Sequence, residues 1–351
     1  MKVQSVILAA GICLAAAPGW AIDTVKTNKT TAPIQGRVTS VSPTEVVLEK
    51  GPAGGTTATI PVNEVVFIFF EDDPSSLREA RQEVVKGLYE EALARLEKIT
   101  VKENVRPEIG QDVEFYAAYC RAQLALAGGE NLIVAGKSLR AFLDKNKESY
   151  HWFKAYELLG DLYVANGSFA AAEKAYDEVA KAPWVDYKMR AGVARGRALL
   201  AQEKAPEAAK AFDTVLATTT DSDLAETQKM AAQVGKARIL AMEKKTDDAL
   251  KLLQPIIQKV ENDKSDADQL DLLAHAYATS AFAKRLAGRS EEARYDYLRV
   301  HLLYPQAPEP HAEALYNLGQ LWEEFHKPER ASEARKLLKE QYQHSSWAKK
   351  G

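Results

Sequence analysis

The sequence is poor in cysteine, with two cysteines in 351 residues, and this excludes a disulfide-stabilised scaffold and a cysteine-rich zinc module. It also lacks an excess of one charge: 46 basic residues oppose 49 acidic ones, and a net charge of −3 gives no basis for general nucleic-acid binding. Aromatic residues make up only 8%, whereas alanine is abundant, and this favours closely packed helices. The 46% apolar and 27% charged residues exclude wholesale disorder, collagen and a polytopic membrane protein.

The first 21 residues are typical of a secretory signal peptide. Lys2 is followed by the apolar stretch Ser5 to Ala17, and small residues suit cleavage after Ala21. The stretch is too short to cross a hydrocarbon layer of roughly 30 Å. The alternative is that these residues remain as an uncleaved N-terminal anchor. A lipoprotein is disfavoured, because the residue before Cys13 is Ile12 and not a small residue. We therefore expect a protein secreted across the inner membrane into the periplasm or the extracellular space, either free or associated with the envelope.

Residues 22–32 are polar and rich in Thr and Lys, and we predict a flexible leader there. From 33 to 73 the chain has β-branched runs bounded by Gly and Pro, which are the signals of short strands. The runs are Ile34 to Val41, Val46 to Leu48, Thr57 to Ile60 and Val65 to Phe70. Residues 33–73 thus predict a small β module, either a sheet or a partial barrel, which is marginal in size and should depend on the next domain.

From residue 74 to about 343 the chain alternates amphipathic helices with short breaks, and one unit carries the clearest signature. In this unit, Tyr156-x2-Leu159-Gly160-x2-Tyr163 is followed by Ala172-x3-Tyr176 and then by Pro183. The unit resembles the tetratricopeptide repeat (TPR), with Tyr in place of Trp at its start and the Pro about one residue early. The resemblance implies a helix–turn–helix repeat in which small residues let two helices approach closely.

The same spacing of small residues recurs along the chain, from a first helix to a second. The pairs are Ala80/Ala92, Gly160/Ala172, Gly196/Ala208, Ala237/Ala249, Ala281/Ala293 and Gly319/Ala331, with a degenerate unit centred on Ala135. We therefore predict a mainly α fold, a right-handed TPR-like α-solenoid of about seven helical hairpins over residues 74–343, preceded by the β module. Residues 344–351 should form a polar tail after the last hairpin.

Motifs for catalysis and metal binding are not found in the sequence. There is no HExxH or GxSxG motif, and the six histidines are scattered. Loss of the signal peptide would leave Cys120 alone in an Ala-rich helix, where we expect a small buried side chain. Gly129 to Ser138 faintly resembles a P-loop, but Asn131 stands where that loop needs glycine. We expect a non-enzymatic protein without cofactor or metal, in which carboxylate runs such as Glu71-Asp72-Asp73 are solvated or cap helices.

In the TPR family the first helix of each unit lines the concave face, and the corresponding positions here are candidate partner-binding residues. They are Lys154, Arg190, Arg197, Arg238, Phe282, Arg285 and Tyr316. An arginine-bearing groove with apolar pockets suits an acidic or C-terminal peptide, because Arg pairs bidentately with carboxylates. The alternative is that these arginines pair within the repeats. Glu157 and Asp161 stand where the family's two-carboxylate clamp needs Lys and Asn, so we do not expect that activity.

Two functions are open at this point. The first is a protein–protein interaction scaffold or adaptor in the cell envelope that captures a peptide or protein partner on the concave face. The second is a structural envelope component whose β module docks to a membrane protein or a cell-wall polymer, with the repeats as a spacer or a surface for self-association. Neither function involves nucleic acid.

Overall fold

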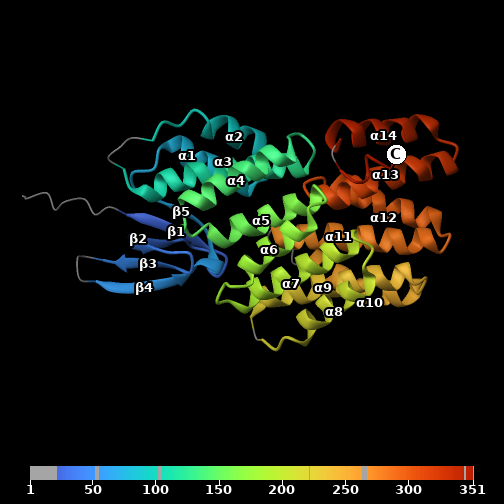
Figure 1. The fold of residues 1–351 in the computed structure, drawn as a ribbon, viewed down its shortest axis with the longest axis horizontal. Coiled ribbons are helices and arrows are strands. Elements are labelled where there is room, and N and C mark those ends of the chain that lie inside the picture. Colours follow the sequence, from blue (N-terminus) through green and yellow to red (C-terminus); the bar gives the residue numbers. More distant parts are fainter. Residues whose placement is uncertain are drawn as a thin grey trace, which may run out of the picture.

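The structure, a computed structural model, describes residues 22–51, 55–101, 105–220, 222–262, 267–343 and 345–350. The predicted signal peptide, residues 1–21, lies outside the described residues. Within them the chain forms a five-stranded antiparallel sheet followed by fourteen helices. The predicted fold class, a TPR-like solenoid after a small β module, is therefore confirmed (Figure 1).

The β module is a curled sheet. Its strands are β1 (Asp23–Thr27), β2 (Ile34–Val41), β3 (Glu45–Lys50), β4 (Thr56–Pro61) and β5 (Val65–Phe69), in the spatial order β4-β3-β2-β1-β5. Only the 3-10 turn Val62–Glu64 joins β4 to β5, although these strands lie at opposite edges. In a flat sheet, four interstrand spacings of about 4.8 Å would separate the edges by about 19 Å, which is further than this link reaches. The sheet must therefore curl towards a partial barrel.

The prediction of a flexible leader over residues 22–32 is wrong, because β1 lies within it and pairs with both β2 and β5. Val25 is fully buried, and Asp23 accepts hydrogen bonds from the N–H groups of Val38 (2.8 Å) and Glu71 (2.9 Å). One apolar residue among polar ones gives almost no strand signal in a sequence. Hydrogen bonds to a neighbouring strand on each side, β2 and β5, nevertheless order this polar segment.

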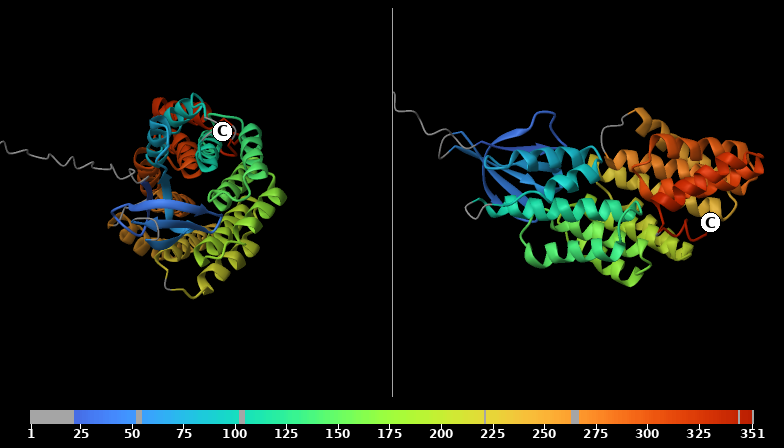
Figure 2. Two further views of the ribbon diagram at one scale, coloured as in Figure 1. Left: turned by 90° about the vertical axis from the view of Figure 1, so that its left-hand side faces the viewer. Right: turned by 90° about the horizontal axis from the view of Figure 1, so that it is seen from above.

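The helices form seven antiparallel hairpins within the described residues. The hairpins are α1 (Ser75–Val85) with α2 (Tyr89–Leu96), α3 (Pro107–Leu126) with α4 (Leu132–Lys145), α5 (Trp152–Ala165) with α6 (Phe169–Val179), α7 (Val185–Ala201) with α8 (Ala205–Ala217), α9 (Asp223–Met242) with α10 (Thr246–Asn262), α11 (Ala267–Leu286) with α12 (Ser290–Leu303), and α13 (Pro308–Glu324) with α14 (Pro328–Gln341). Successive odd-numbered helices contact one another on the inside, and the even-numbered helices lie outside. Seen end on, the hairpins follow a ring, and the β module covers one end of it (Figure 2).

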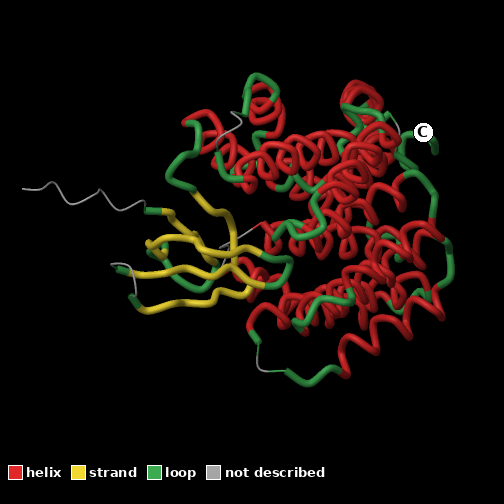
Figure 3. The backbone as a smooth tube through the Cα atoms, turned by 60° about the vertical axis from the view of Figure 1, so that its left-hand side comes forward, coloured by secondary structure: helices red, strands yellow, loops and turns green. Residues whose placement is uncertain are grey.

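The β module and the helices share a hydrophobic core rather than forming separate bodies. Val38, Leu48 and Ile68 of the sheet belong to the same buried cluster as residues of α1 to α5. On the far side of the ring, Asn63 donates a hydrogen bond of 3.0 Å to Asp186 of α7. The sheet therefore sits directly against the helices, as Figure 3 shows.

The superhelix closes on itself where the turn after α3 meets the end of α14. Gln343 Nε2 donates to the carbonyl oxygen of Gly128 at 3.4 Å, and Ala127 packs against the cluster that contains Tyr342. Gly128 has φ +87°, and a Cβ at this position would lie only 2.1 Å from the carbonyl oxygen of Gln341. Glycine therefore permits both the turn and the contact that closes the ring.

The residues predicted to pack the repeats lie inside the hairpin interfaces. All thirteen are buried, namely the glycines Gly160, Gly196 and Gly319 and the alanines Ala80, Ala92, Ala135, Ala172, Ala208, Ala237, Ala249, Ala281, Ala293 and Ala331. A Cβ at Gly160 or Gly196 would lie 2.3 Å from a ring atom of Tyr176 or Phe212, respectively. The glycine thus makes room for the bulky residue four positions after the paired alanine, rather than for the alanine itself. At Gly319 the corresponding neighbour is Cγ of Arg335, at 3.2 Å.

The turn inside each hairpin has the same backbone form. In the described residues each of these turns contains one residue with positive φ, namely Gly87, Gly128, Gly167, Glu203, Lys244, Gly288 or His326. In the third hairpin, Ser168 N–H then bonds back to the carbonyl oxygen of Tyr163 at 2.7 Å. This is the Schellman pattern, which satisfies the last carbonyl groups of the first helix.

We expect Gly167→Ala to lower the free energy of unfolding by about 1 kcal/mol. A Cβ at Gly167 meets no atom within 4 Å, so the loss comes from the left-handed backbone (φ +74°) alone. Gly110 of α3 is the matched control, because its Cβ would make only an ordinary contact with Val101 at 3.8 Å. Gly110→Ala should raise stability by roughly 0.5–1 kcal/mol. Urea unfolding measures both, and changes of the same sign would contradict the role of the turn.

Candidate binding site on the inner face

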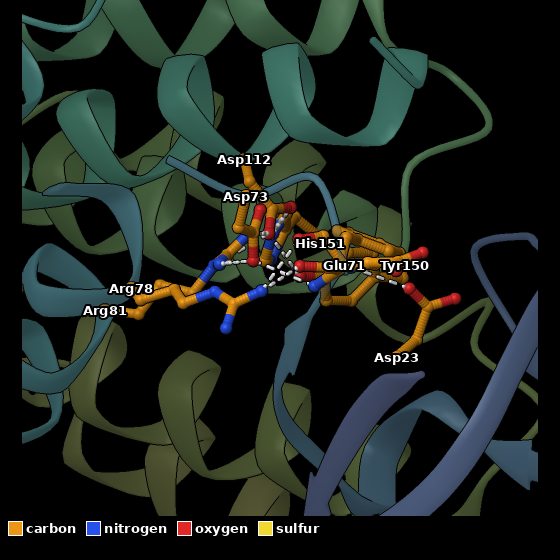
Figure 4. Close-up of polar contacts among 9 residues, drawn as sticks. Asp23, Glu71, Asp73, Arg78, Arg81, Asp112, Tyr150 and His151 are labelled. Carbon is orange, nitrogen blue, oxygen red and sulfur yellow. Dashed lines mark hydrogen bonds and ion pairs between the residues drawn. The ribbon is translucent and has the colours of Figure 1, made fainter. Parts of the chain in front are cut away.

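A buried charged cluster joins the β module to the first three hairpins (Figure 4). Arg81 of α1 contacts Asp73 at 2.5 Å and Asp112 of α3 at 2.5 Å. Asp112 also accepts a hydrogen bond from the Tyr150 hydroxyl and lies 2.9 Å from His151 Nε2. Burial would raise the pKa of Asp112, but Arg81 and His151 hold it below its ordinary value. Burial lowers the pKa of His151, so its neutral ring donates to the carboxylate.

This cluster has no access for a substrate. The side chains of Arg81, Asp73 and Asp112 are 0% exposed, and the Phe115 ring stacks on His151 with a centroid separation of 3.7 Å. The prediction that the carboxylates of residues 71–73 are solvated or capping is wrong for the Asp73 side chain, which the pairing with Arg81 draws into the interior. We conclude that the cluster holds the β module on the helices.

The other candidates for chemistry are also structural. Cys120 is buried in α3, and burial raises the pKa of its thiol to about 12, so the thiol stays protonated. Asn131 caps α4 by accepting the N–H groups of Ile133 and Val134 at 2.9 and 3.2 Å, so the P-loop-like segment simply begins a helix. Among the described residues, no three His, Cys, Asp or Glu side chains are grouped to hold a metal ion.

The predicted arginines of α7 lie on the inner face but pair with carboxylates of the chain itself. Arg190 contacts Glu157 of α5 at 3.2 Å and Asp268 of α11 at 2.5 Å. Arg197 lies 3.5 Å from Asp271, also on α11. Arg190 holds the pKa of Asp268 well below its usual range, so this carboxylate is charged. The superhelix is coiled tightly enough for ion pairs to join helices that are two hairpins apart.

The next inner helices repeat this arrangement. Arg238 of α9 contacts Glu313 of α13 at 2.7 Å, and its guanidinium carbon lies 3.7 Å from the ring centroid of Phe282. Lys154 pairs with Glu157 at 2.9 Å. Internal pairing, the alternative for the predicted arginines, therefore describes this stretch of the inner face. It speaks against the hypothesis that these cations bind an acidic peptide.

The last two hairpins contain a half-open hollow on the inner side. Phe282 and Arg285 of α11 meet Tyr316 of α13 there, and the hollow has a volume of about 430 Å³. We call it the α11–α13 pocket; its lining is Phe282, Arg285, Leu286, Tyr316, Asn317, Trp347 and Lys350. A second hollow of about 560 Å³ shares Tyr316 and continues towards α14, lined also by Gln320, Glu323, Glu324, Arg335 and Leu338. The structure thus brings three of the predicted partner-binding residues together, although Arg285 also pairs with Glu324 at 3.2 Å, and it leaves the other four in internal pairs.

The prediction of a polar tail over residues 344–351 needs correction, because residues 345–350 fold back on α13. The ring centroids of Trp347 and Tyr316 lie 5.5 Å apart, and the Trp347 indole N–H points to Glu309 Oε1 at 3.5 Å. Ala348 packs on the hydrophobic cluster of α13 and α14. The single tryptophan in a polar segment was the available signal for this contact.

A buried chain of polar side chains stabilises the same end of the fold. His311 Nε2 lies 2.8 Å from His301 Nδ1, and His311 Nδ1 lies 2.5 Å from the Tyr342 hydroxyl. Burial, and then the neighbouring His301, lowers the pKa of His311 to about 4. His311 is therefore neutral at pH 7 and links α12, α13 and the end of α14.

Acidification should weaken this link. Between pH about 6.5 and about 4 the unfolded chain binds a proton at His311 that the folded chain does not, so the free energy of unfolding should fall as the pH falls through this window. The loss should reach about 2–3 kcal/mol near pH 4. Urea unfolding at pH 7.5 and pH 4.5 should show a smaller loss for His311→Asn than for the wild type. The exposed control His326→Asn should keep the wild-type loss, and equal losses in all three proteins would contradict the assignment.

Comparisons with known proteins agree with the repeat architecture. A model of the tetratricopeptide repeat family matches residues 193–264, from within α7 to just after α10. No curated protein matches the chain. Within the described residues, no helix is both long enough and apolar enough to cross a membrane.

The solved structures that resemble the chain include the following three. A tetratricopeptide repeat protein from Parabacteroides merdae has 17% identity and a TM-score of 0.47, covering 78% of this chain and 96% of its own. NprR in complex with its cognate peptide NprX has 14% identity and a TM-score of 0.44, covering 77% and 79%. The TPR domain of P58(IPK) has 13% identity and a TM-score of 0.29, covering 79% and 76%.

Proposed function

We propose that the chain is a non-enzymatic protein–protein interaction scaffold that binds a peptide or protein partner in the α11–α13 pocket. The observation that carries the proposal is the convergence of Phe282, Arg285 and Tyr316 on one half-open hollow, since the repeat pattern alone predicts that these positions contact a partner. Aromatic and Arg side chains in a hollow are the usual anchors of protein interfaces. A rigid, preformed helical surface also loses little entropy on binding.

We also propose that the scaffold works in the periplasm or outside the cell, where it assists an envelope process. The support for this placement is the signal-peptide pattern of residues 1–21, which lie outside the described part of the chain. Fractionation of the native host, followed by N-terminal sequencing of the mature chain, tests it. Recovery from the cytoplasm with an intact N-terminus would contradict this placement.

The test of the binding site compares two double variants. Phe282→Ala with Tyr316→Ala removes two aromatic side chains that line the pocket. Leu302→Ala with Leu303→Ala removes side chains of α12 that are 68% and 58% exposed. Each tagged protein is used to capture partners from the native envelope fraction, and mass spectrometry quantifies them. The pocket variant should recover its main partner about tenfold less than the wild type, and the α12 variant should match the wild type. Equal recovery by both variants, with circular dichroism unchanged, would place the site elsewhere.

Docking through the β module is a second candidate, favoured by the position of β4. This strand lies at an edge of the sheet and pairs only with β3 in the described residues, so an added strand can pair with it. Deleting residues 33–73 is a poor test, because it removes Asp73 and leaves Arg81 without that partner. Thr57→Glu with Thr59→Glu changes exposed side chains of β4 instead. Loss of envelope retention with intact partner recovery would support docking, and unchanged retention would oppose it.

A further inference from the structure

Two side chains of the C-terminal segment, residues 345–350, form part of the wall of the α11–α13 pocket. Trp347 packs near Tyr316, and Lys350 Nζ lies 4.3 Å from the Trp347 ring centroid. Both side chains line the pocket together with Phe282 and Arg285. The chain therefore places its own aromatic and cationic side chains where the proposed function places a partner.

The segment is held in a way that permits displacement. It begins as a turn after α14, with Ser345 N–H bonded to the carbonyl oxygen of Tyr342 at 2.9 Å. Among the described residues, its hydrogen bond to α13 is the long one from Trp347 to Glu309, at 3.5 Å. Lys350 is exposed. Release of this segment would remove the packing of Trp347 and Ala348 on the last hairpin, but it would break no hydrogen bond between the helices of that hairpin.

Apart from Lys350 of the segment itself, Arg285 carries the charge in the pocket lining, and the carboxylates of Glu324 and Glu309 lie just outside that lining. Arg285 is the pocket's own cation, but it donates to Gln320 at 2.7 Å and pairs with Glu324 at 3.2 Å. Glu309, on the side of Trp347, is 62% exposed. The carboxylates of Glu324 and Glu309 would repel an acidic peptide. They would attract a lysine that follows an aromatic residue in a peptide, and the ring of that aromatic residue would attract the lysine as well.

From this arrangement we infer that the α11–α13 pocket recognises a peptide in which an aromatic residue is followed within three positions by Lys or Arg. Residues 345–350 are the chain's own ligand of this kind, and the partner displaces them. This inference rests on the proposed function and specifies the chemistry of its partner. A tethered segment competes with a free ligand at an effective concentration in the millimolar range. A partner must therefore bind the pocket with enough affinity to outcompete the segment, which excludes weak, non-specific ligands.

The test uses the full chain and a fluorescent synthetic peptide with the sequence of residues 345–351, Ser-Ser-Trp-Ala-Lys-Lys-Gly. The double variant Trp347→Ala with Lys350→Ala, called the open variant, removes the segment's two side chains from the pocket lining. Fluorescence anisotropy should show that the peptide binds this variant about tenfold more tightly than it binds the wild type. A peptide with Ala in place of Trp and of the last Lys should not bind. Adding Tyr316→Ala to the open variant should abolish binding, whereas adding Leu302→Ala should leave it unchanged.

Lys350→Ala alone, at an exposed position, provides a variant whose fold is not at risk, and it should raise the affinity about two- to threefold. Equal affinity of the peptide for the open variant and the wild type would overturn the inference. Sedimentation that shows a dimer of the wild type but not of the open variant would also overturn it, because a second copy would then be the occupant. The proposed function fails separately, when the pocket variant still captures its partner from the envelope fraction.

Discussion

Replacing Arg81 with methionine is expected to lower the free energy of unfolding by about 3–5 kcal/mol. The substitution keeps most of the side-chain volume but leaves the buried carboxylates of Asp73 and Asp112 without their shared cation. Urea unfolding followed by circular dichroism measures the loss. Asp112→Leu added to Arg81→Met should recover part of it, because apolar side chains of similar volume often replace a buried ion pair at little cost.

Arg95 of α2 supplies a matched control for this experiment. It also contacts two carboxylates, Glu79 at 2.6 Å and Glu83 at 2.7 Å, but its side chain is 36% exposed. Arg95→Met should cost far less, since water replaces the lost partner of an exposed carboxylate. Equal losses at Arg81 and Arg95 would show that burial does not determine the strength of the junction between the β module and the helices.

Phe212→Ala is expected to cost about 3–5 kcal/mol, the second large effect. Phe212 of α8 is fully buried between two glycines of neighbouring inner helices. A Cβ at Gly196 of α7 would lie 2.3 Å from the ring, and one at Gly235 of α9 would lie 2.2 Å from it. The ring therefore fills the space where the fourth and fifth hairpins meet, and its removal leaves a cavity bordered by rigid backbone.

The reverse substitution gives the control. Gly235→Ala should cost about 1–3 kcal/mol, because the new methyl group collides with the Phe212 ring. Phe212→Leu combined with Gly235→Ala should cost less than the sum of the two single substitutions, since the smaller side chain leaves room for the methyl group. Strict additivity in thermal unfolding of the four proteins would show that the two positions do not contact each other.

The hairpins could be predicted because their pattern is local. Each pair of small residues lies within one hairpin, and the turn between the two helices needs only one residue that tolerates positive φ. Glu203, Lys244 and His326 adopt this conformation without being glycine, so the glycines alone reveal only part of the series. Strand β1 could not be predicted, because Val25 is the one apolar residue in it and gives too weak a strand signal. This strand is ordered by pairing with β2 and β5, which follow it in the chain.

Side chains a few positions apart are enough to predict the seven hairpins, the face of each that turns inwards and the residues available on that face. The partners of those residues depend on contacts between distant hairpins, which no local pattern contains. Coiling of the superhelix pairs Arg190 with Asp268 and Arg238 with Glu313, whose separation along the chain hides the pairing. The same closure brings Trp347 over Tyr316 and leaves the α11–α13 pocket as the place where a partner can bind.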